Sequence, residues 1–205
     1  MKFFSPDSKF AQIMTSVGEM MLLNLCWIIS SLPLITIGAA NTAMYTVMGR
    51  RLRKEGSGTI VPFFKAWWAN LKLSIAFWIA QLLISVSLGL ALYLPLPGFF
   101  KIISGIVLIL VTLVLSVVYP QIARFRNKWL NYIKNALILI VYRFGWVLLN
   151  LLLFLLPAGV FLVDPAFFLK IGWIWLVFGF SLLFYLSARI MQKILKPLED
   201  IVSGK

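Results

Sequence analysis

Five long stretches of this sequence contain no Asp, Glu, Lys or Arg, and they constrain the fold more than any other feature. They cover residues 20–49, 73–100, 102–123, 144–163 and 171–188. A helix that crosses a bilayer needs about 20 apolar residues, so each stretch is long enough to supply one. Because a span in lipid must satisfy its own backbone hydrogen bonds, the stretches predict helices.

The composition agrees with a chain that is surrounded by lipid. Hydrophobic residues make up 62% of the sequence and charged residues 12%, whereas a soluble domain is about half apolar and about a quarter charged. The sequence therefore predicts an all-α, polytopic membrane helical bundle that forms one domain over residues 1–205. We expect spans at about 18–38, 72–94, 102–123, 144–163 and 169–190, a short helix at about 39–54 and an interfacial helix at about 124–136. The first apolar segment is too long for a cleavable signal peptide, so we expect none.

The positive charges predict an orientation. With five spans, the Lys and Arg residues gather on alternate sides, and only Lys2, Lys9, Lys101 and Lys170 of the 19 cations fall on the poorer side. Cytoplasmic loops collect Lys and Arg. We therefore expect a multi-pass protein of the bacterial cell membrane, with its N-terminus outside and its C-terminus in the cytoplasm.

The net charge of +13 is explained more simply by contact with lipid than by binding to nucleic acid. The cations flank apolar spans, form no single basic face and accompany no nucleic-acid-binding motif. The lipid bilayer, including the anionic lipids of the inner leaflet, is the expected partner, because each nearby Lys or Arg is attracted to that leaflet by roughly 1 kcal/mol. We expect no nucleic acid partner.

A proline and a run of small residues interrupt the first apolar stretch. Pro33 lacks a backbone donor and predicts a kink near Ser30. After it, small side chains recur at helical spacing, which lets another helix approach closely. Two interpretations stay open: packing within this chain, or a contact for another protein. The residues of this kink and packing segment are Pro33, Gly38, Ala39, Thr42 and Ala43.

Four cations end that segment, and we expect them to hold it at the cytoplasmic surface. They are Arg50, Arg51, Arg53 and Lys54. Three further residues are candidates for polar groups inside the membrane, namely Glu19, Asn24 and Asn41. An ionisable residue in a span is a functional hypothesis by default. However, Glu19 is expected near the outer end of its span, where a carboxylate reaches headgroups or water, and the amides also fit interhelical hydrogen bonding.

Residue types that carry out chemistry are scarce. The chain has no His, a single cysteine (Cys26) and only six acidic residues. It therefore lacks the commonest general base and the commonest transition-metal ligand, and one thiol forms no metal cluster. We expect no catalytic, cofactor-binding or metal-binding residues, no cofactor and no enzyme activity.

Part of the sequence resembles a known family. The stretch NLCWIISSLPLITIGAANTAMYTVMGRRLRKEG, residues 24–56, is followed by FFKAWWANLK. Both segments resemble the YesL-type family of bacterial integral membrane proteins, a domain-of-unknown-function family. The matching residues are Asn24, Pro33, Thr36, Gly38, Ala39, Ala43, Tyr45, Phe63, Phe64 and Lys65. The resemblance implies a multi-pass protein of about this length, found mostly in Bacillota, whose gene often lies beside those of carbohydrate ABC-transporter components. It implies no activity and no functional residue.

Three functions follow as hypotheses. The first is a non-catalytic membrane accessory protein that works with a carbohydrate ABC uptake system and contacts its permease subunits through the helix at 39–54 and the basic cytoplasmic faces. The second is an independent small-solute transporter or channel, which predicts a polar path around Pro33 lined by Thr36, Asn41 and Thr42. The third is a structural membrane protein unrelated to sugars.

Overall fold

The computed structural model describes residues 8–56 and 58–203, and within these ranges the chain is helical and contains no strand. Five of the helices are long and apolar enough to cross a membrane. The predicted all-α fold with about five transmembrane helices is therefore confirmed, and the chain is a multi-pass membrane protein. In chain order the elements are α1 (Lys9–Ser31), η1 (Leu34–Thr36), α2 (Ile37–Leu52), α3 (Ile60–Ala69), α4 (Leu71–Tyr93), α5 (Gly98–Arg124), α6 (Trp129–Tyr142), α7 (Phe144–Val163), α8 (Pro165–Lys170), α9 (Gly172–Ile174), the π-helix η2 (Trp175–Gly179) and α10 (Phe180–Ser203).

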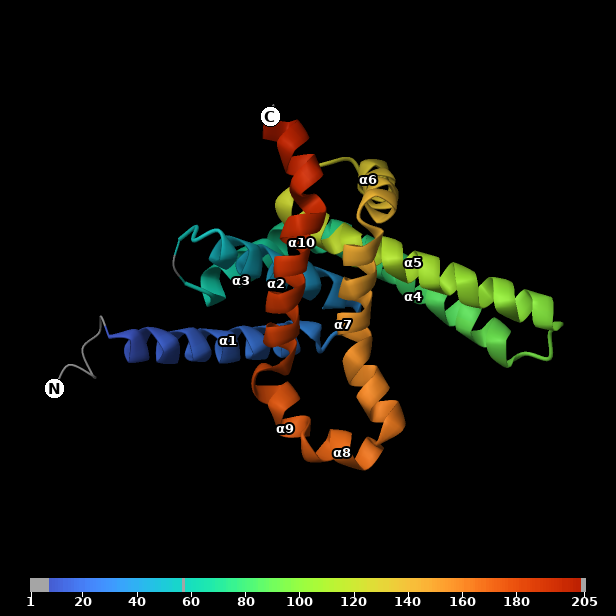
Figure 1. Ribbon diagram of the computed structural model, residues 1–205, viewed down its shortest axis with the longest axis horizontal. Coiled ribbons are helices and arrows are strands. Elements are labelled where there is room, and N and C mark those ends of the chain that lie inside the picture. Colours follow the sequence, from blue (N-terminus) through green and yellow to red (C-terminus); the bar gives the residue numbers. More distant parts are fainter. Residues whose placement is uncertain (1–7, 57, 204–205) are drawn as a thin grey trace.

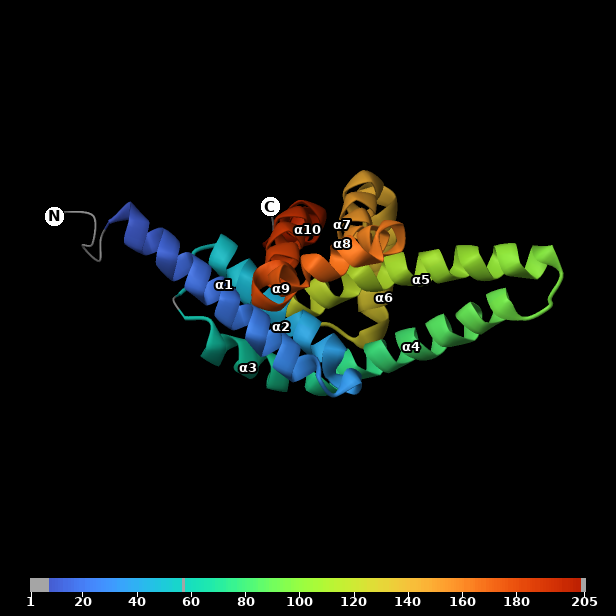
Figure 2. The same ribbon diagram turned by 90° about the horizontal axis from the view of Figure 1, so that it is seen from below.

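The elements form three arms around a common centre (Figure 1). One arm is α1. The second is the antiparallel hairpin of α4 and α5, which extends away from α1, and the third contains α7 and α10, which lie side by side and are joined through α8 and α9. Turned by 90°, the molecule shows α1 lying along α2 and the far ends of α4 and α5 standing apart from the rest (Figure 2). The centre therefore holds the core, and the arms present apolar surface.

The central helix is α2. It contacts α1, α3, α4, α5 and α10, and nine of its residues are buried. Small residues line much of its surface, and small side chains let several helices approach one another closely in a membrane. The hairpin is different, because the only buried residues of α4 are Ser74 and Phe77, both in its first third.

The first helix lies earlier in the chain than the span expected at 18–38. α1 covers Lys9–Ser31 and ends two residues before Pro33, which has an extended backbone at φ −75° and ψ 99°. Pro33 has no N–H to continue the helical hydrogen bonds. It therefore ends α1 completely, where the sequence predicted only a kink within a continuous span.

Two further elements differ from expectation. The interfacial helix predicted at 124–136 is α6, which begins only at Trp129. The Tyr132 hydroxyl holds the preceding loop in place, since it donates to the carbonyl oxygen of Phe125 at 2.8 Å and accepts from the N–H of Asn127 at 3.0 Å. The span predicted at 169–190 corresponds to one unbroken helical run, Gly172–Asp200, which includes the π-helix η2 and follows the short helix α8.

Candidate functional site

The chain reverses direction at Pro33. The Thr36 hydroxyl lies 2.6 Å from the carbonyl oxygen of Ser30 and 2.7 Å from that of Pro33, and the indole N–H of Trp78 donates to the carbonyl oxygen of Leu34 at 2.7 Å. Carbonyl groups left free at a helix end must find such partners in an apolar environment. The segment after α1 is therefore a closed turn, fastened to α4, that sends α2 back along α1.

Gly38 brings the backbones of α2 and α4 into contact. A Cβ atom on Gly38 would overlap the carbonyl oxygen of Ser74 and lie 2.7 Å from the Cβ of Trp78. One turn further along, the hydroxyls of Thr42 and Ser74 are 2.9 Å apart. Only glycine fits this position without moving one of the two helices.

The small residues of α2 pack inside this chain. Ala39, Thr42 and Ala43 have no exposed surface, since they lie among the neighbouring helices. Of the two interpretations left open by the sequence, the structure supports intramolecular packing. The small-residue face of α2 is therefore enclosed within this chain.

Asn24 fastens α1 to the π-helix. Its amide nitrogen donates to the carbonyl oxygens of Trp175 at 3.0 Å and Leu176 at 2.7 Å, and its amide oxygen accepts from the N–H of Ser181 at 3.0 Å. A π-helix disturbs the regular backbone pairing of the helix around it, and a free backbone group in lipid costs several kcal/mol. Asn24 satisfies three such groups and is itself fully buried.

Two more polar connections cross the core. The indole N–H of Trp27 donates to the amide oxygen of Asn41 at 3.0 Å. The hydroxyls of Tyr45 and Ser187 are 2.7 Å apart, and Ser187 also donates to the amide oxygen of Asn150 at 2.5 Å. Sequence reasoning missed Ser187, which lies next to the basic end of its span. Its only sequence signal is helical spacing, since it lies on the same face of α10 as Phe184 and Met191.

Glu19 and Arg51 form an ion pair with an N–O distance of 2.9 Å, and Arg51 also donates to the backbone carbonyl of Ser16. The sequence placed Glu19 near the outer end of a span and Arg51 on the cytoplasmic side. Those two placements contradict each other, because two groups in an ion pair must lie at the same depth relative to the membrane. The reason is the turn at Pro33, which folds α2 back onto the first half of α1.

The basic end of α2 joins a second ion-pair network. Arg53 donates two hydrogen bonds, of 2.7 and 2.9 Å, to the Glu55 carboxylate, and Arg124 pairs with Glu199 at 2.9 Å and lies 3.9 Å from Glu55. The hydrogen bond from Arg53 and the surrounding guanidinium charges hold the pKa of Glu55 below its ordinary value. This network ties the ends of α2, α5 and α10 together.

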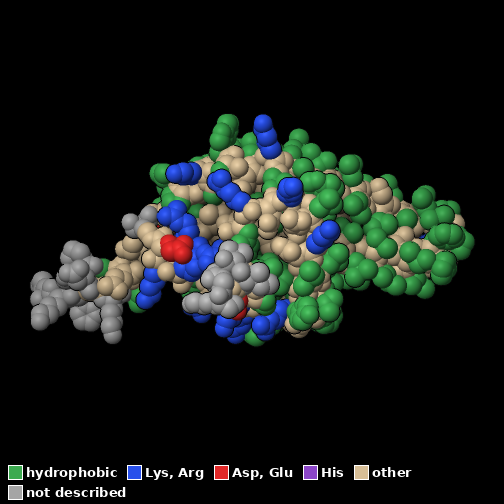
Figure 3. All heavy atoms as spheres, turned by 90° about the horizontal axis from the view of Figure 1, so that it is seen from above, with side chains coloured by type: hydrophobic (Ala, Val, Ile, Leu, Met, Phe, Trp, Pro, Cys, Tyr) green, Lys and Arg blue, Asp and Glu red, His purple; other side chains and the backbone are tan. Residues whose placement is uncertain are grey.

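The remaining two cations of this group, Arg50 in the last turn of α2 and Lys54 just after it, shape the turn that follows α2. The Nε of Arg50 donates to the backbone carbonyl of Glu55 at 3.3 Å, and Lys54 has a left-handed backbone with φ 57°. Figure 3 shows the molecule from above. Lys and Arg side chains gather on one part of the face seen there, away from the hydrophobic end of the α4–α5 arm.

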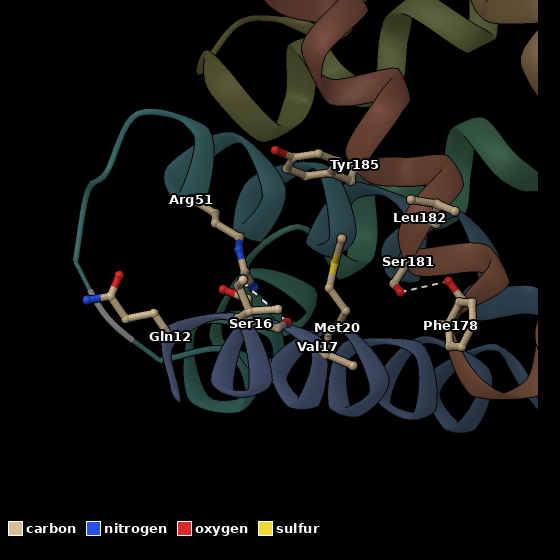
Figure 4. Close-up of a pocket in the computed structure, with 10 residues that line it drawn as sticks. Gln12, Ser16, Val17, Met20, Arg51, Phe178, Ser181, Leu182 and Tyr185 are labelled. Carbon is tan, nitrogen blue, oxygen red and sulfur yellow. Dashed lines mark hydrogen bonds between the residues drawn. The ribbon is translucent and has the colours of Figure 1, made fainter. Parts of the chain in front are cut away.

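An open groove of about 840 Å³ lies between α1 and α10. Figure 4 shows Ser16, Val17 and Met20 of α1 facing Ser181, Leu182 and Tyr185 of α10. Its lining, in full, is Gln12, Ile13, Ser16, Val17, Met20, Arg51, Phe178, Ser181, Leu182 and Tyr185.

A smaller cavity of about 390 Å³ lies among α2, α4, α5, α7 and α10. Its walls are mostly aromatic and aliphatic, with a few polar groups that include Asn41, Gln81 and Tyr119. The Tyr119 hydroxyl already donates to the amide oxygen of Gln81 at 3.0 Å. Over residues 8–56 and 58–203, no group of His, Cys, Asp or Glu side chains is arranged to hold a metal ion.

Part of this chain matches the model of a known protein family. Residues 20–92 match the family model described as "Protein of unknown function, DUF624". The segment covers α1 from its second half, the Pro33 turn, α2, α3 and nearly all of α4. No curated protein and no solved structure matches the chain.

Proposed function

We propose that this chain, whose residues 20–92 match the DUF624 family model, is a non-catalytic integral membrane accessory protein. Its partner is the permease of a carbohydrate ABC uptake system. The carbohydrate system follows from the family resemblance alone. The accessory role rests on the way in which this chain uses its polar residues.

One observation carries the proposal: most polar side chains of the membrane core bond to other groups of this chain, and the amide nitrogen of Asn150 and the indole N–H of Trp175 are exceptions. Asn24 binds the backbone of η2 and α10, Thr42 bonds to Ser74, and Asn150 accepts from Ser187. A transporter leaves polar groups free to replace the hydration shell of its solute. Here the same groups stabilise helix packing, which is the usual role of such residues in a membrane protein.

The acidic residues are also engaged, which supports a role without catalysis. Glu19, Glu55 and Glu199 lie in ion pairs, and the Asp164 carboxylate accepts from the N–H of Phe167 at the start of α8. A general base needs an available carboxylate beside the reacting group. The ion pairs of Glu19, Glu55 and Glu199 make these three carboxylates weaker proton acceptors.

The outer part of the α4–α5 hairpin is the surface through which the protein contacts its partner. Beyond Phe77, α4 has no buried residue, and this arm stands apart from the other helices (Figure 2). Such a long apolar arm suits lateral packing against the helices of another membrane protein. The exposed apolar side chains of the arm include Leu83, Val86, Leu90, Ile106, Ile109 and Leu110.

We infer an orientation in which the start of α1 and the end of α10 both lie on the cytoplasmic side of the cell membrane. The C-terminus stays in the cytoplasm, as the cations of α10 indicate. Because Arg51 is cytoplasmic by the same rule, the Glu19–Arg51 pair brings the first half of α1 to that side. In this arrangement α1 and α2 form a hairpin that enters the membrane from the cytoplasmic side and returns to it.

One feature favours the alternative of a small-solute transporter, namely the cavity of about 390 Å³ near Asn41 and Gln81. Three residues predicted to line a polar path have other partners. Thr36 bonds to the Pro33 turn, Asn41 accepts from Trp27 and Thr42 bonds to Ser74. The accessory role therefore has the stronger support.

Site-specific photo-crosslinking in native membranes tests the proposal. A photoreactive residue replaces Leu90 on the hairpin in one variant and Leu152 of α7 in a matched control, since both side chains are exposed and apolar. We expect mass spectrometry to identify an ABC permease bound at position 90 in stoichiometric amounts and absent at position 152. Recovery of the chain without a permease contradicts the proposal, and solute uptake by vesicles containing the chain alone supports the transporter.

A further inference from the structure

The groove between α1 and α10 has the shape and surface of a site for an acyl chain. Val17 and Met20 on one side face Leu182 and Phe178 on the other. The polar groups in its wall are largely engaged within the protein: the Ser181 hydroxyl donates to the carbonyl oxygen of Phe178 at 2.9 Å, and Arg51 pairs with Glu19. Most of the surface that remains is apolar, with Gln12 and Ser16 as further polar residues of the wall.

A cation without an acidic partner lies beside this groove. Arg189 donates to the hydroxyl of Tyr185 at 2.6 Å, with its guanidinium carbon 4.8 Å from the centre of the Tyr185 ring. Tyr185 is itself part of the groove wall. In the described part of the chain, Arg51, Arg53 and Arg124 all have carboxylate partners, and Arg189 has none.

Together the groove and the cation point to a binding site for one anionic phospholipid of the inner leaflet. Its acyl chain lies between α1 and α10, and its phosphate accepts hydrogen bonds from the Arg189 guanidinium. Arginine matches a phosphate well, because two of its N–H groups donate to two oxygens at once. Basic pockets between transmembrane helices on the cytoplasmic side bind anionic headgroups in this way.

The charge argues for a lipid rather than a partner helix in the groove. An apolar helix laid there would cover the Arg189 guanidinium and leave it without a counter-charge, which is costly in an apolar interface. A phospholipid supplies the apolar chain and the anion in a single molecule. This inference does not depend on the proposed accessory function, because it concerns a different face from the α4–α5 hairpin.

Native mass spectrometry of the full chain in detergent tests the site, with dioleoyl phosphatidylglycerol and dioleoyl phosphatidylcholine as the two probes. We expect the anionic lipid to bind more tightly at a single saturable site. Arg189→Gln should weaken that binding by about five-fold, the effect of one cation near an anionic headgroup, and Arg189→Lys should keep most of it. Lys193→Gln is the matched control, because Lys193 lies on the same helix but over the ring of Trp146, and it should have no effect.

A second variant tests the acyl-chain half of the site. Val17→Trp fills the groove from the exposed face of α1 and should weaken binding of the anionic lipid, while glycerol 3-phosphate, which lacks an acyl chain, should not compete. Equal affinity for the two lipids, full binding by Arg189→Gln, or full binding by Val17→Trp overturns the proposal. Thermal unfolding of each variant in the same detergent separates lost binding from lost folding.

Discussion

Asn24 places both polar atoms of its side-chain amide on the backbone of helices more than 150 residues away in the sequence. In an apolar environment, a backbone carbonyl or N–H that loses its partner keeps the full cost of its desolvation. Asn24 therefore holds a locally irregular helix in place, and its removal leaves three backbone groups with one partner fewer. The same logic applies to Ser187 and Asn150, whose hydrogen bond is fully buried.

Replacing Asn24 should destabilise the fold. Asn24→Leu keeps the approximate size of the side chain but removes its hydrogen bonds, and we expect a loss of roughly 1–3 kcal/mol in the free energy of unfolding. Denaturant-induced unfolding in detergent measures this loss. Asn131→Ala on the exposed face of α6 is the control and should leave the unfolding free energy unchanged. An equal effect of both variants would contradict the role of Asn24.

A second residue-scale prediction concerns Gly38. Gly38→Ala forces a Cβ atom against the Ser74 backbone and the Trp78 side chain, so it should cost roughly 1–3 kcal/mol by overpacking. Gly105→Ala in α5 is the matched control, because nothing lies within 4 Å of its added Cβ. That variant should be neutral or slightly stabilising, since alanine favours a helix over glycine. Unfolding midpoints of both variants in one detergent make the comparison.

At the level of elements, uniform apolar helices were predictable and interrupted ones were not. The spans expected at 72–94 and 144–163 correspond closely to α4 and α7. Charged residues border these long charge-free runs, and they limit the positions at which each helix can begin and end. The first span failed for a specific reason: hydropathy continues through Pro33, although the backbone hydrogen bonds do not. The π-helix at Trp175–Gly179 has no sequence signal, since its partner Asn24 is distant.

The same limit applies to the candidate residues. Burial of Gly38, Ala39, Thr42 and Ala43 agrees with the small-residue spacing, which is a local property of the sequence. The Glu19–Arg51 pair was not predictable, because it depends on the direction that α2 takes after the turn. Sequence therefore indicated which residues pack closely, and only the structure gave the elements against which they pack.

The network that joins α2, α5 and α10 predicts a pH dependence. Because the pKa of Glu55 is lowered in the folded state, its contribution to stability is present above the ordinary carboxylate pKa of about 4.3 and is lost as pH falls through the lower folded pKa. We expect Glu55 to cause no change in the melting temperature in detergent between pH 7 and pH 5. Below that range the wild type should lose more stability than Glu55→Gln. Parallel pH profiles of the two proteins contradict the prediction.

For the whole molecule, the proposed orientation of the chain depends on the turn at Pro33. The sequence expectation of an external N-terminus treated the first apolar stretch as one crossing. In the orientation proposed above, the helical hairpin of α1 and α2 replaces that crossing, and Lys9 at the start of α1 lies on the side that carries most of the positive charge.

Cysteine labelling tests this topology. In a Cys26→Ser background, which has no other cysteine, single cysteines replace the exposed residues Gln12, Tyr93 and Asn127. A membrane-impermeant maleimide added to intact cells should label position 93 and leave positions 12 and 127 unlabelled, whereas all three should react after the cells are opened. Labelling of position 12 in intact cells would restore the external N-terminus.

The long separation between Asn24 and its partners also has a consequence for the time course of synthesis. Trp175 and Leu176 follow Asn24 by 151 and 152 residues, so at roughly 5–20 residues per second Asn24 leaves the ribosome roughly 8 to 30 s before them. During that interval the Asn24 amide must bind water, a headgroup or the translocation machinery. A nascent chain that stops before η2 therefore lacks this fastening and holds α1 through contacts such as the Glu19–Arg51 ion pair and the Trp27–Asn41 hydrogen bond with α2.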